Sequence, residues 1–233
     1  MKKESALIKG IDLYNKKKYM EAKNEFLIAS EEGSDYEKVE ANLYLGKIAL
    51  RSDGELLFDA KNYIDYVLEC GNDYQKEQAT FELATKYRIL NYFDDAIKLY
   101  KKCLEIIPND LYVLTDLVNL YLKLDEVNEA EKYCFYLLDG AKYSNSFRKK
   151  TISTNAAYLG LARVNFRKGD IKKLWEYLDK VEPLTKRDIE QKSDIEANLM
   201  FNQGKYDEAT DKLQDSLHSN IAFIRELTKD KIA

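Results

Sequence analysis

The sequence predicts an all-α protein, and three observations support this prediction. Only 9 Gly and 2 Pro occur in 233 residues, which disfavours β architectures with their many tight turns. Hydrophobic residues make up 45% of the chain, enough for a substantial core. Amphipathic runs that contain one small residue recur along the chain, so we expect repeated helical units rather than a single irregular fold.

The repeat is defined by one small residue, which we call the anchor of its unit. The intervals between the first four anchors are 38, 36 and 34 residues, and a further unit fits if Leu174 stands where the others have Ala. Leu174 lies 35 residues before the last anchor. The anchors are Ala22, Ala60, Ala96, Ala130, Leu174 and Ala209.

A second small residue lies 12 to 14 positions before most anchors, in its own helical stretch. These residues are Gly10, Gly46, Ala84, Ala162 and Ala197, whereas the fourth unit has Val118. Short polar segments such as "KKK" and "RKGD" separate the two stretches, so each unit is predicted to be two antiparallel helices. Small residues allow the two helices to cross closely.

The position four residues after each anchor lies on the same helical face one turn later. We expect its side chain to fill the groove against the next unit. These residues are Phe26, Ile64, Tyr100, Cys134, Leu178 and Leu213.

Proline and glycine suggest where helices end. Pro108 follows the apolar run "CLEII" and should stop a helix, because proline lacks the backbone donor and disfavours helix for the preceding residue. Gly33, Gly71 and Gly140 stand near the same point of other units, where we expect them to permit a left-handed turn.

With this period, these small residues, Pro108 and an aromatic residue late in the first helix, the chain resembles tetratricopeptide-repeat (TPR) proteins. The resemblance implies a right-handed superhelical solenoid of antiparallel helix pairs, forming a single domain over residues 1–233, with a C-terminal capping helix near 219–231. The late aromatic residues are Tyr14, Tyr87, Tyr121, Phe166 and Phe201. The six predicted repeats are 3–36, 39–74, 77–110, 111–144, 155–188 and 190–218.

The segment from Tyr143 to Thr154 adds about ten residues to the ordinary repeat spacing. It either extends a helix or forms a loop between two repeats.

Residue types argue against catalysis. The single histidine, His218, follows the last repeat, so a His-based triad or metal site is not expected. No glycine-rich phosphate loop is present. Three widely spaced cysteines form no zinc motif or disulfide framework. We therefore predict no enzyme, no metal and no cofactor.

Without a signal peptide or an apolar span of membrane length, we expect a cytoplasmic protein that does not bind membranes.

The resemblance implies that function resides on the first helix of each pair, which in this family lines a concave groove. We therefore predict a non-enzymatic adaptor or scaffold that binds a peptide or helix of another protein. The predicted groove residues are Tyr44, Lys47, Arg51, Phe81, Arg88, Asn119, Lys123, Arg163, Phe166, Arg167, Asn198 and Asn202.

The first predicted helix, "ALIKGIDLY", is unusually apolar. Family members that grip a C-terminal carboxylate have Lys and Asn where this chain has Leu7 and Ile11, so that specific clamp is disfavoured. The helix suits a hydrophobic partner or a homodimer instead. The alternative is that Leu7 and Ile8 pack against the second repeat.

Charge is unevenly distributed. Nine Lys or Arg against one acid, Asp170, give residues 142–173 a local charge of +8, and the rest of the chain therefore carries −4 − 8 = −12. This stretch could attract an acidic partner protein or make an RNA- or nucleotide-responsive module. Aromatic residues for base stacking are sparse in it, which makes nucleic acid the less favoured ligand. A third possibility is that acidic neighbours in space balance the basic residues.

Overall fold

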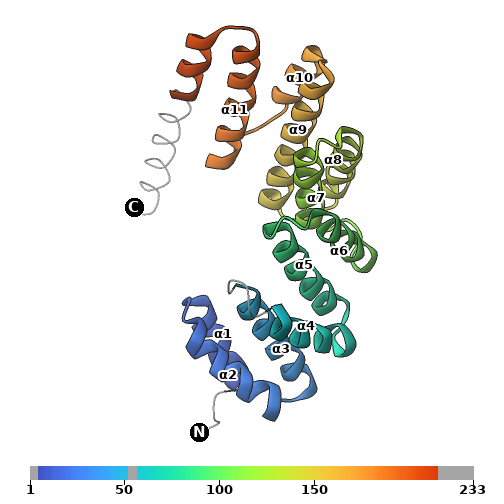
Figure 1. The fold of residues 1–233 in the computed structure, drawn as a ribbon, viewed down its shortest axis with the longest axis vertical. Helices are drawn as coiled ribbons and strands as arrows, with labels where there is room; N and C mark the ends of the chain where they lie inside the picture. Colours follow the sequence, from blue (N-terminus) through green and yellow to red (C-terminus); the bar gives the residue numbers. More distant parts are fainter. Residues whose placement is uncertain (1–4, 52–56, 215–233) are drawn as a thin grey trace. The chain divides into compact units, whose positions relative to one another are not determined.

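The computed structural model describes residues 5–51 and 57–214, and within these ranges every regular element is a helix. Figure 1 shows the helices following one another as antiparallel pairs. The all-α fold of helix pairs predicted from the sequence is confirmed. The chain forms two compact units, Met1–Pro108 and Asn109–Ala233, which we describe separately.

The first unit contains three helix pairs whose consecutive members pack together. Its helices are α1 (Ala6–Asn15), α2 (Tyr19–Glu32), α3 (Asp35–Arg51), α4 (Leu57–Cys70), α5 (Asp73–Ile89) and α6 (Phe93–Ile106). One core cluster lies around Phe26 and Leu45, and a second lies around Ile64 and Val67. Helix α6 ends two residues before Pro108, as that residue predicts.

The second unit continues the same pattern. Its helices are α7 (Leu111–Lys123), α8 (Val127–Lys142), α9 (Phe147–Lys168), α10 (Ile171–Leu178) and α11 (Lys186–Asn202). The chain is helical again from residue 206 to 214, whereas the predicted capping helix at 219–231 lies outside the described residues. A core cluster joins α9, α10 and α11 around Leu159, Leu174 and Ile195.

The anchors lie where the sequence places them, at buried helix crossings. All six anchor side chains are at most 5% exposed, including Leu174 in place of alanine. A Cβ atom added to Gly10 would lie 2.7 Å from the Phe26 ring, and one added to Gly46 would lie 2.9 Å from Ile64. The first-helix glycines therefore make room for the residue four positions after the anchor.

Most of the left-handed residues lie at a different place from the one expected. Gly33 has φ −71°, and neither Gly71 nor Gly140 has a positive φ. Asn109, directly after Pro108, does have a positive φ of 68°, but the other left-handed residues of the described ranges lie inside pairs, five positions before the anchor. In the described pairs they are Lys17, Asn91, Asp125, Gly169 and Gly204, with φ between 60° and 77°. The prediction was wrong for Gly33, Gly71 and Gly140. The turns inside the pairs are the ones that need a left-handed residue to reverse direction, and three of these turns achieve this without glycine.

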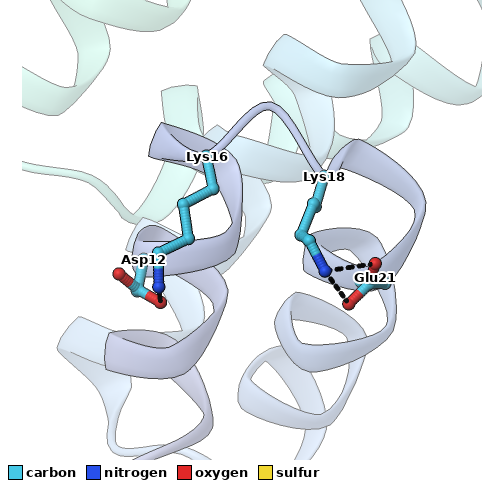
Figure 2. A network of polar contacts seen from close by, with 4 residues as sticks. All are labelled: Asp12, Lys16, Lys18 and Glu21. Carbon is cyan, nitrogen blue, oxygen red and sulfur yellow. Dashed lines mark hydrogen bonds and ion pairs between the residues drawn. The ribbon is translucent and has the colours of Figure 1, made fainter.

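Ion pairs at the first of these turns are local and exposed. Figure 2 shows Lys16 reaching back to Asp12 at 2.7 Å and Lys18 reaching forward to Glu21 at 3.1 Å, on either side of the turn. The two pairs belong to α1 and α2 respectively, so each supports its own helix end rather than the crossing.

The extra residues between the fourth and fifth pairs are mostly helical. Helix α9 begins at Phe147, eight residues before the predicted start of the fifth repeat at residue 155. Ser146 caps it by accepting a hydrogen bond from the Lys149 backbone N–H at 3.3 Å. This N-terminal extension makes α9 22 residues long, whereas its partner α10 has only 8.

Candidate functional site

The predicted groove residues of α3 form an aromatic cluster with α1 and α2. The Tyr44 ring stacks on Phe26 with centroids 4.8 Å apart and meets Tyr14 edge-on at 5.0 Å. Burial raises the pKa of the Tyr44 hydroxyl, and Glu40 adds to the effect. Arg51 donates to the Tyr14 hydroxyl at 3.2 Å and lies 4.9 Å above the Tyr19 ring. These contacts join the first two helix pairs. Arg51 itself is exposed at the edge of the cluster.

Lys47 and Phe81 link further first helices of the same unit. The Lys47 ammonium on α3 lies 3.7 Å from the Glu82 carboxylate and 3.4 Å from the Gln78 side-chain oxygen, both on α5. Phe81 packs against Tyr100 with centroids 5.7 Å apart. Arg88 donates from Nε to the hydroxyl of the same tyrosine at 3.3 Å. Internal contacts therefore occupy most of these polar groups.

Helix α1, which was predicted to suit a homodimer, buries much of its apolar surface inside the first unit. Leu7 is buried in the core cluster around Phe26, and Ile11 packs against that cluster. Ile8 is 57% exposed. The alternative prediction was that Leu7 and Ile8 pack against the second repeat. Leu7 does so, whereas Ile8 is largely exposed.

In the second unit, the amides and one lysine of the predicted groove are solvent-accessible. Lys123 is exposed at the end of α7, and Asn119 is half-buried one turn earlier. Asn198 and Asn202 are exposed on α11. Asn198 also lines a cavity of about 270 Å³ beside Phe201 and Tyr206.

Arg163 is the most unusual of the predicted residues. Its guanidinium group on α9 is partly buried, and no hydrogen bond or ion pair joins it to the part of the chain that the structure describes. Burial lowers its pKa, the Asp194 carboxylate of α11 opposes this, and Arg167 and Arg187 lower it further. A desolvated cation without a hydrogen-bonding partner is an unfavourable arrangement in a folded protein.

The other two predicted groove residues of α9, Phe166 and Arg167, contact other parts of the second unit instead. Arg167 forms an ion pair with Asp125 at 2.7 Å and donates to the Leu122 carbonyl at 2.8 Å, which satisfies the end of α7. Phe166 packs against the core cluster that contains Leu174. Arg163 and Arg167 share a helix face, as predicted, but only Arg163 lacks a partner among the described residues.

A family comparison agrees with this architecture. A family model described as "Tetratricopeptide repeat" matches residues 91–135, which span α6, α7 and the first half of α8. The fold is similar to the crystal structure of a tetratricopeptide repeat protein from Parabacteroides merdae, with a TM-score of 0.69 and 18% identity. That match covers 92% of this chain and 78% of the other. Residues 91–135 therefore match a tetratricopeptide repeat, and the chain has the fold of a tetratricopeptide-repeat (TPR) protein. No curated protein sequence matches it.

TPR units generally mediate protein–protein interaction, and the surface chemistry of such a fold decides what it can bind. The basic stretch of this chain divides into two groups. One group forms ion pairs: Lys142 with Asp139 at 3.0 Å, Lys168 with Glu131 at 2.7 Å, Lys173 with Asp170 at 3.2 Å, and Arg167 as described above. Charge balance in space, the third sequence-based alternative, therefore accounts for this group.

The other basic group is not balanced in this way. Arg148, Lys149, Lys150 and Lys172 form no ion pair with any residue of the described ranges. The Lys149 ammonium lies 4.7 Å above the Tyr112 ring. Three of these four cations belong to the N-terminal extension of α9, so the positive charge available to a ligand lies there rather than at Arg167.

The described part of the chain offers no metal site. Within residues 5–51 and 57–214, no three or more His, Cys, Asp or Glu side chains gather closely enough to hold a metal ion. Over the same ranges, no helix is both long and apolar enough to cross a membrane. His218 lies outside the described residues.

Two groups of surface residues were not anticipated from the sequence. The first is the pair Arg187 and Asp194, which α11 brings near Arg163. The second surrounds the N-terminal extension of α9 and includes Thr154, Tyr158 and Lys180. The helix-capping pattern "SNSFRKK", which places α9 earlier than the repeat spacing does, is the signal that could have revealed this second group.

Proposed function

We propose that this TPR protein is a non-enzymatic adaptor or scaffold, a single solenoid that binds a peptide or helix of a partner protein on the first helices of its pairs. The family resemblance supports the general mode of action. The residues of α7, α9 and α11 support a binding face in the second unit, because amide and basic side chains remain accessible there.

Arg163 is the observation on which this proposal depends. A partly buried guanidinium without a partner among the described residues would gain most from a ligand that supplies one, either a carboxylate or the carbonyl oxygens of a peptide. Asn198 on α11 offers a further donor and acceptor on the same unit. An adaptor that binds a peptide backbone requires groups of this kind.

The experiment compares partner capture by matched variants. Affinity purification from the native cell, followed by quantitative mass spectrometry, is performed with the wild type, Arg163→Met and the control Lys61→Met. Both substitutions remove one positive charge, and Lys61 is an exposed residue of α4. We expect Arg163→Met to lose its main partner about tenfold or more, since removing a buried charge contact costs roughly 1.4 kcal/mol or more.

The control decides how this result is interpreted. If Arg163→Met captures the same partners in the same amounts as Lys61→Met, Arg163 does not bind the partner and the proposed face is wrong. Circular dichroism of both variants shows whether a loss reflects binding or misfolding.

As part of the same proposal, we place this adaptor in the cytoplasm. Its three cysteines form no disulfide with one another, and Cys103 and Cys134 are buried. Such thiols are typical of proteins that work in a reducing compartment. Fractionation of the native cell tests the placement directly.

A further inference from the structure

The N-terminal half of α9 is left uncovered by its own partner helix. At 1.5 Å per residue, α9 is about 33 Å long and α10 only about 12 Å. Helix α10 runs back along the C-terminal half of α9 and ends at Leu178. We use the name α9 furrow for the depression over residues 147–158, bounded by residues 135–142 of α8 on one side and by residues 180–182 on the other.

Polar contacts fix the second boundary of the α9 furrow. The Asn155 side chain donates to the Glu182 carbonyl at 2.6 Å and accepts from the Glu182 backbone N–H at 3.1 Å. It also donates to the Asp188 carboxylate at 3.1 Å. Because the buried Asn155 amide both donates to and accepts from the Glu182 backbone, it holds the chain after α10 in place. This boundary of the furrow is therefore fixed by hydrogen bonds within the second unit.

Two cavities meet in the furrow. One, of about 440 Å³, is lined on the far side by Lys180 and Glu182. The other, of about 500 Å³, is lined by Phe135 and Leu138 of α8. Both share Lys150, Thr154 and Tyr158, which lie four residues apart on one face of α9. The two cavities therefore lie next to each other along this face of α9, and their walls contain apolar and cationic side chains.

The cations of the furrow are available to a ligand. Lys150 and Lys180 form no ion pair within the described ranges, although Lys180 lies 5.8 Å from the Tyr158 ring centre and 5.2 Å from that of Tyr177. Lys142 is paired with Asp139. Arg148 and Lys149 flank Lys150 on the same helix turn and add to the positive potential.

Apolar side chains frame these charges. Phe147, at the start of α9, is 76% exposed, and Phe135 on α8 is 48% exposed. Large aromatic side chains with this exposure commonly anchor a bound chain. A ligand of the furrow would thus carry both negative charge and at least one apolar side chain.

An acidic protein segment fits this chemistry better than a nucleic acid. The Tyr158 and Tyr177 rings stack on each other at 6.3 Å with Lys180 close to both, which leaves less ring surface for stacking with bases. Glu182 and Asp139 lie in the walls and would repel a continuous phosphate backbone. Separate carboxylates of a peptide could instead be spaced to meet Lys150 and Lys180.

We propose that the α9 furrow binds an acidic segment of a partner protein, with carboxylates on Lys150 and Lys180 and an apolar side chain against Phe135 or Phe147. This surface lies on a different side of α9 from Arg163, the residue on which the proposed function depends. Tyr158 and Arg163 are five residues apart, which places them about 140° apart around α9. Either surface can therefore be tested while the other stays intact.

The first experiment selects the ligand chemistry. A library of randomised short peptides is selected on the full chain, with Thr154→Trp for counter-selection, because an indole at the junction of the two cavities fills the furrow. We expect the enriched peptides to be rich in Asp and Glu and to contain Phe, Leu or Trp. No enrichment, or enrichment of basic or uncharged peptides, would overturn the proposal.

The second experiment measures binding of the best acidic peptide by fluorescence polarisation. The double variant Lys150→Glu/Lys180→Glu should weaken binding at least about tenfold. The matched control Lys61→Glu/Lys172→Glu has the same net charge and changes two exposed lysines outside the furrow, so it should bind like the wild type. A loss of the same size in Arg163→Met would assign the peptide to the Arg163 face instead and would overturn the proposal.

Two further outcomes would contradict the proposal. Equal losses in the furrow variant and its matched control would show that the peptide responds only to net charge. Oligouridylate that binds as tightly as the acidic peptide and is lost in the same furrow variant would assign the surface to single-stranded nucleic acid instead. Circular dichroism confirms that each variant is folded.

Discussion

At the scale of single residues, the turns inside the helix pairs carry most of the backbone strain in the described chain. Each described turn needs one residue at positive φ, a conformation that disfavours side chains with a Cβ atom. Gly169 and Gly204 adopt it freely, whereas Lys17, Asn91 and Asp125 do so at a cost. The same geometry is therefore reached with different residues in different pairs.

This difference predicts opposite effects of two substitutions. Gly169→Ala should lower the free energy of unfolding by about 1 kcal/mol, because no atom lies within 4 Å of the added Cβ and only backbone strain remains. Lys17→Gly should raise it by up to about 1 kcal/mol. Urea denaturation followed by circular dichroism measures both. An unchanged midpoint for Gly169→Ala would show that the turn does not require the left-handed conformation.

The three thiols should differ sharply in reactivity. Cys70 is exposed, whereas Cys103 and Cys134 are buried. Burial, and to a smaller extent Glu131, raises the pKa of the Cys134 thiol to about 12. Since the thiolate is the reactive form, this group stays protonated and unreactive even near pH 9.

Titration with Ellman's reagent tests this difference. The native protein should release one equivalent of thionitrobenzoate and the guanidinium-denatured protein three. Cys134→Ser should leave the native value unchanged and reduce the denatured value by one. A drop in the native value of Cys134→Ser would mean that this thiol is accessible in the folded protein.

At the scale of the helix pair, the decisive feature is the complementary size of facing side chains. Gly10 on α1 allows the Phe26 ring of α2 to fill the crossing, and Phe26 in turn stacks on Tyr44 of α3. One small residue thus fixes the packing within a pair and, through the aromatic ring, between pairs.

In a double-mutant cycle at this crossing, the effect of Gly10→Ala on stability should change sign when Phe26 is replaced by Leu. Gly10→Ala alone should destabilise the protein, because the 2.7 Å contact with the Phe26 ring costs about 1–3 kcal/mol and outweighs the roughly 1 kcal/mol gain in helix propensity. In a Phe26→Leu background the clash is relieved, so Gly10→Ala should stabilise instead. Thermal unfolding of the four proteins measures the coupling. Additive effects would show that the two side chains do not compete for the same space.

At the scale of the whole molecule, we expect charge to contribute little to stability. Many ion pairs join residues three or four apart on one helix and are well exposed, such as Asp12 with Lys16 in Figure 2. Pairs of this kind each contribute little to the free energy of unfolding. The unpaired cations of the α9 extension are, in contrast, available to a ligand.

Stability and binding should therefore respond differently to salt. Raising NaCl from about 50 mM to about 500 mM should shift the midpoint of thermal unfolding by only a few degrees. The same change should weaken acidic-peptide binding to the α9 furrow by at least about tenfold. A large fall in the unfolding midpoint would assign a stabilising role to ion pairs such as Lys47 with Glu82, which join different helices.

The sequence by itself determined that this chain forms helix pairs and where their helices cross. Residue size and apolar periodicity are local properties that repeat at a fixed interval, so the buried positions of Ala22 and Ala96 could be predicted directly. Helix ends were harder, because the Ser146 cap and the left-handed turns depend on backbone conformation that several residue types can adopt.

Only the tertiary structure decided which surface groups remain available for binding. Arg163 and Arg167 are equivalent in the sequence pattern, yet Arg167 reaches Asp125 on another pair and Arg163 has no such partner among the described residues. Similarly, the furrow exists because α10 ends before it can cover the extension of α9. Ion pairing and coverage depend on distances between side chains far apart in sequence, and a local pattern contains no information about those distances.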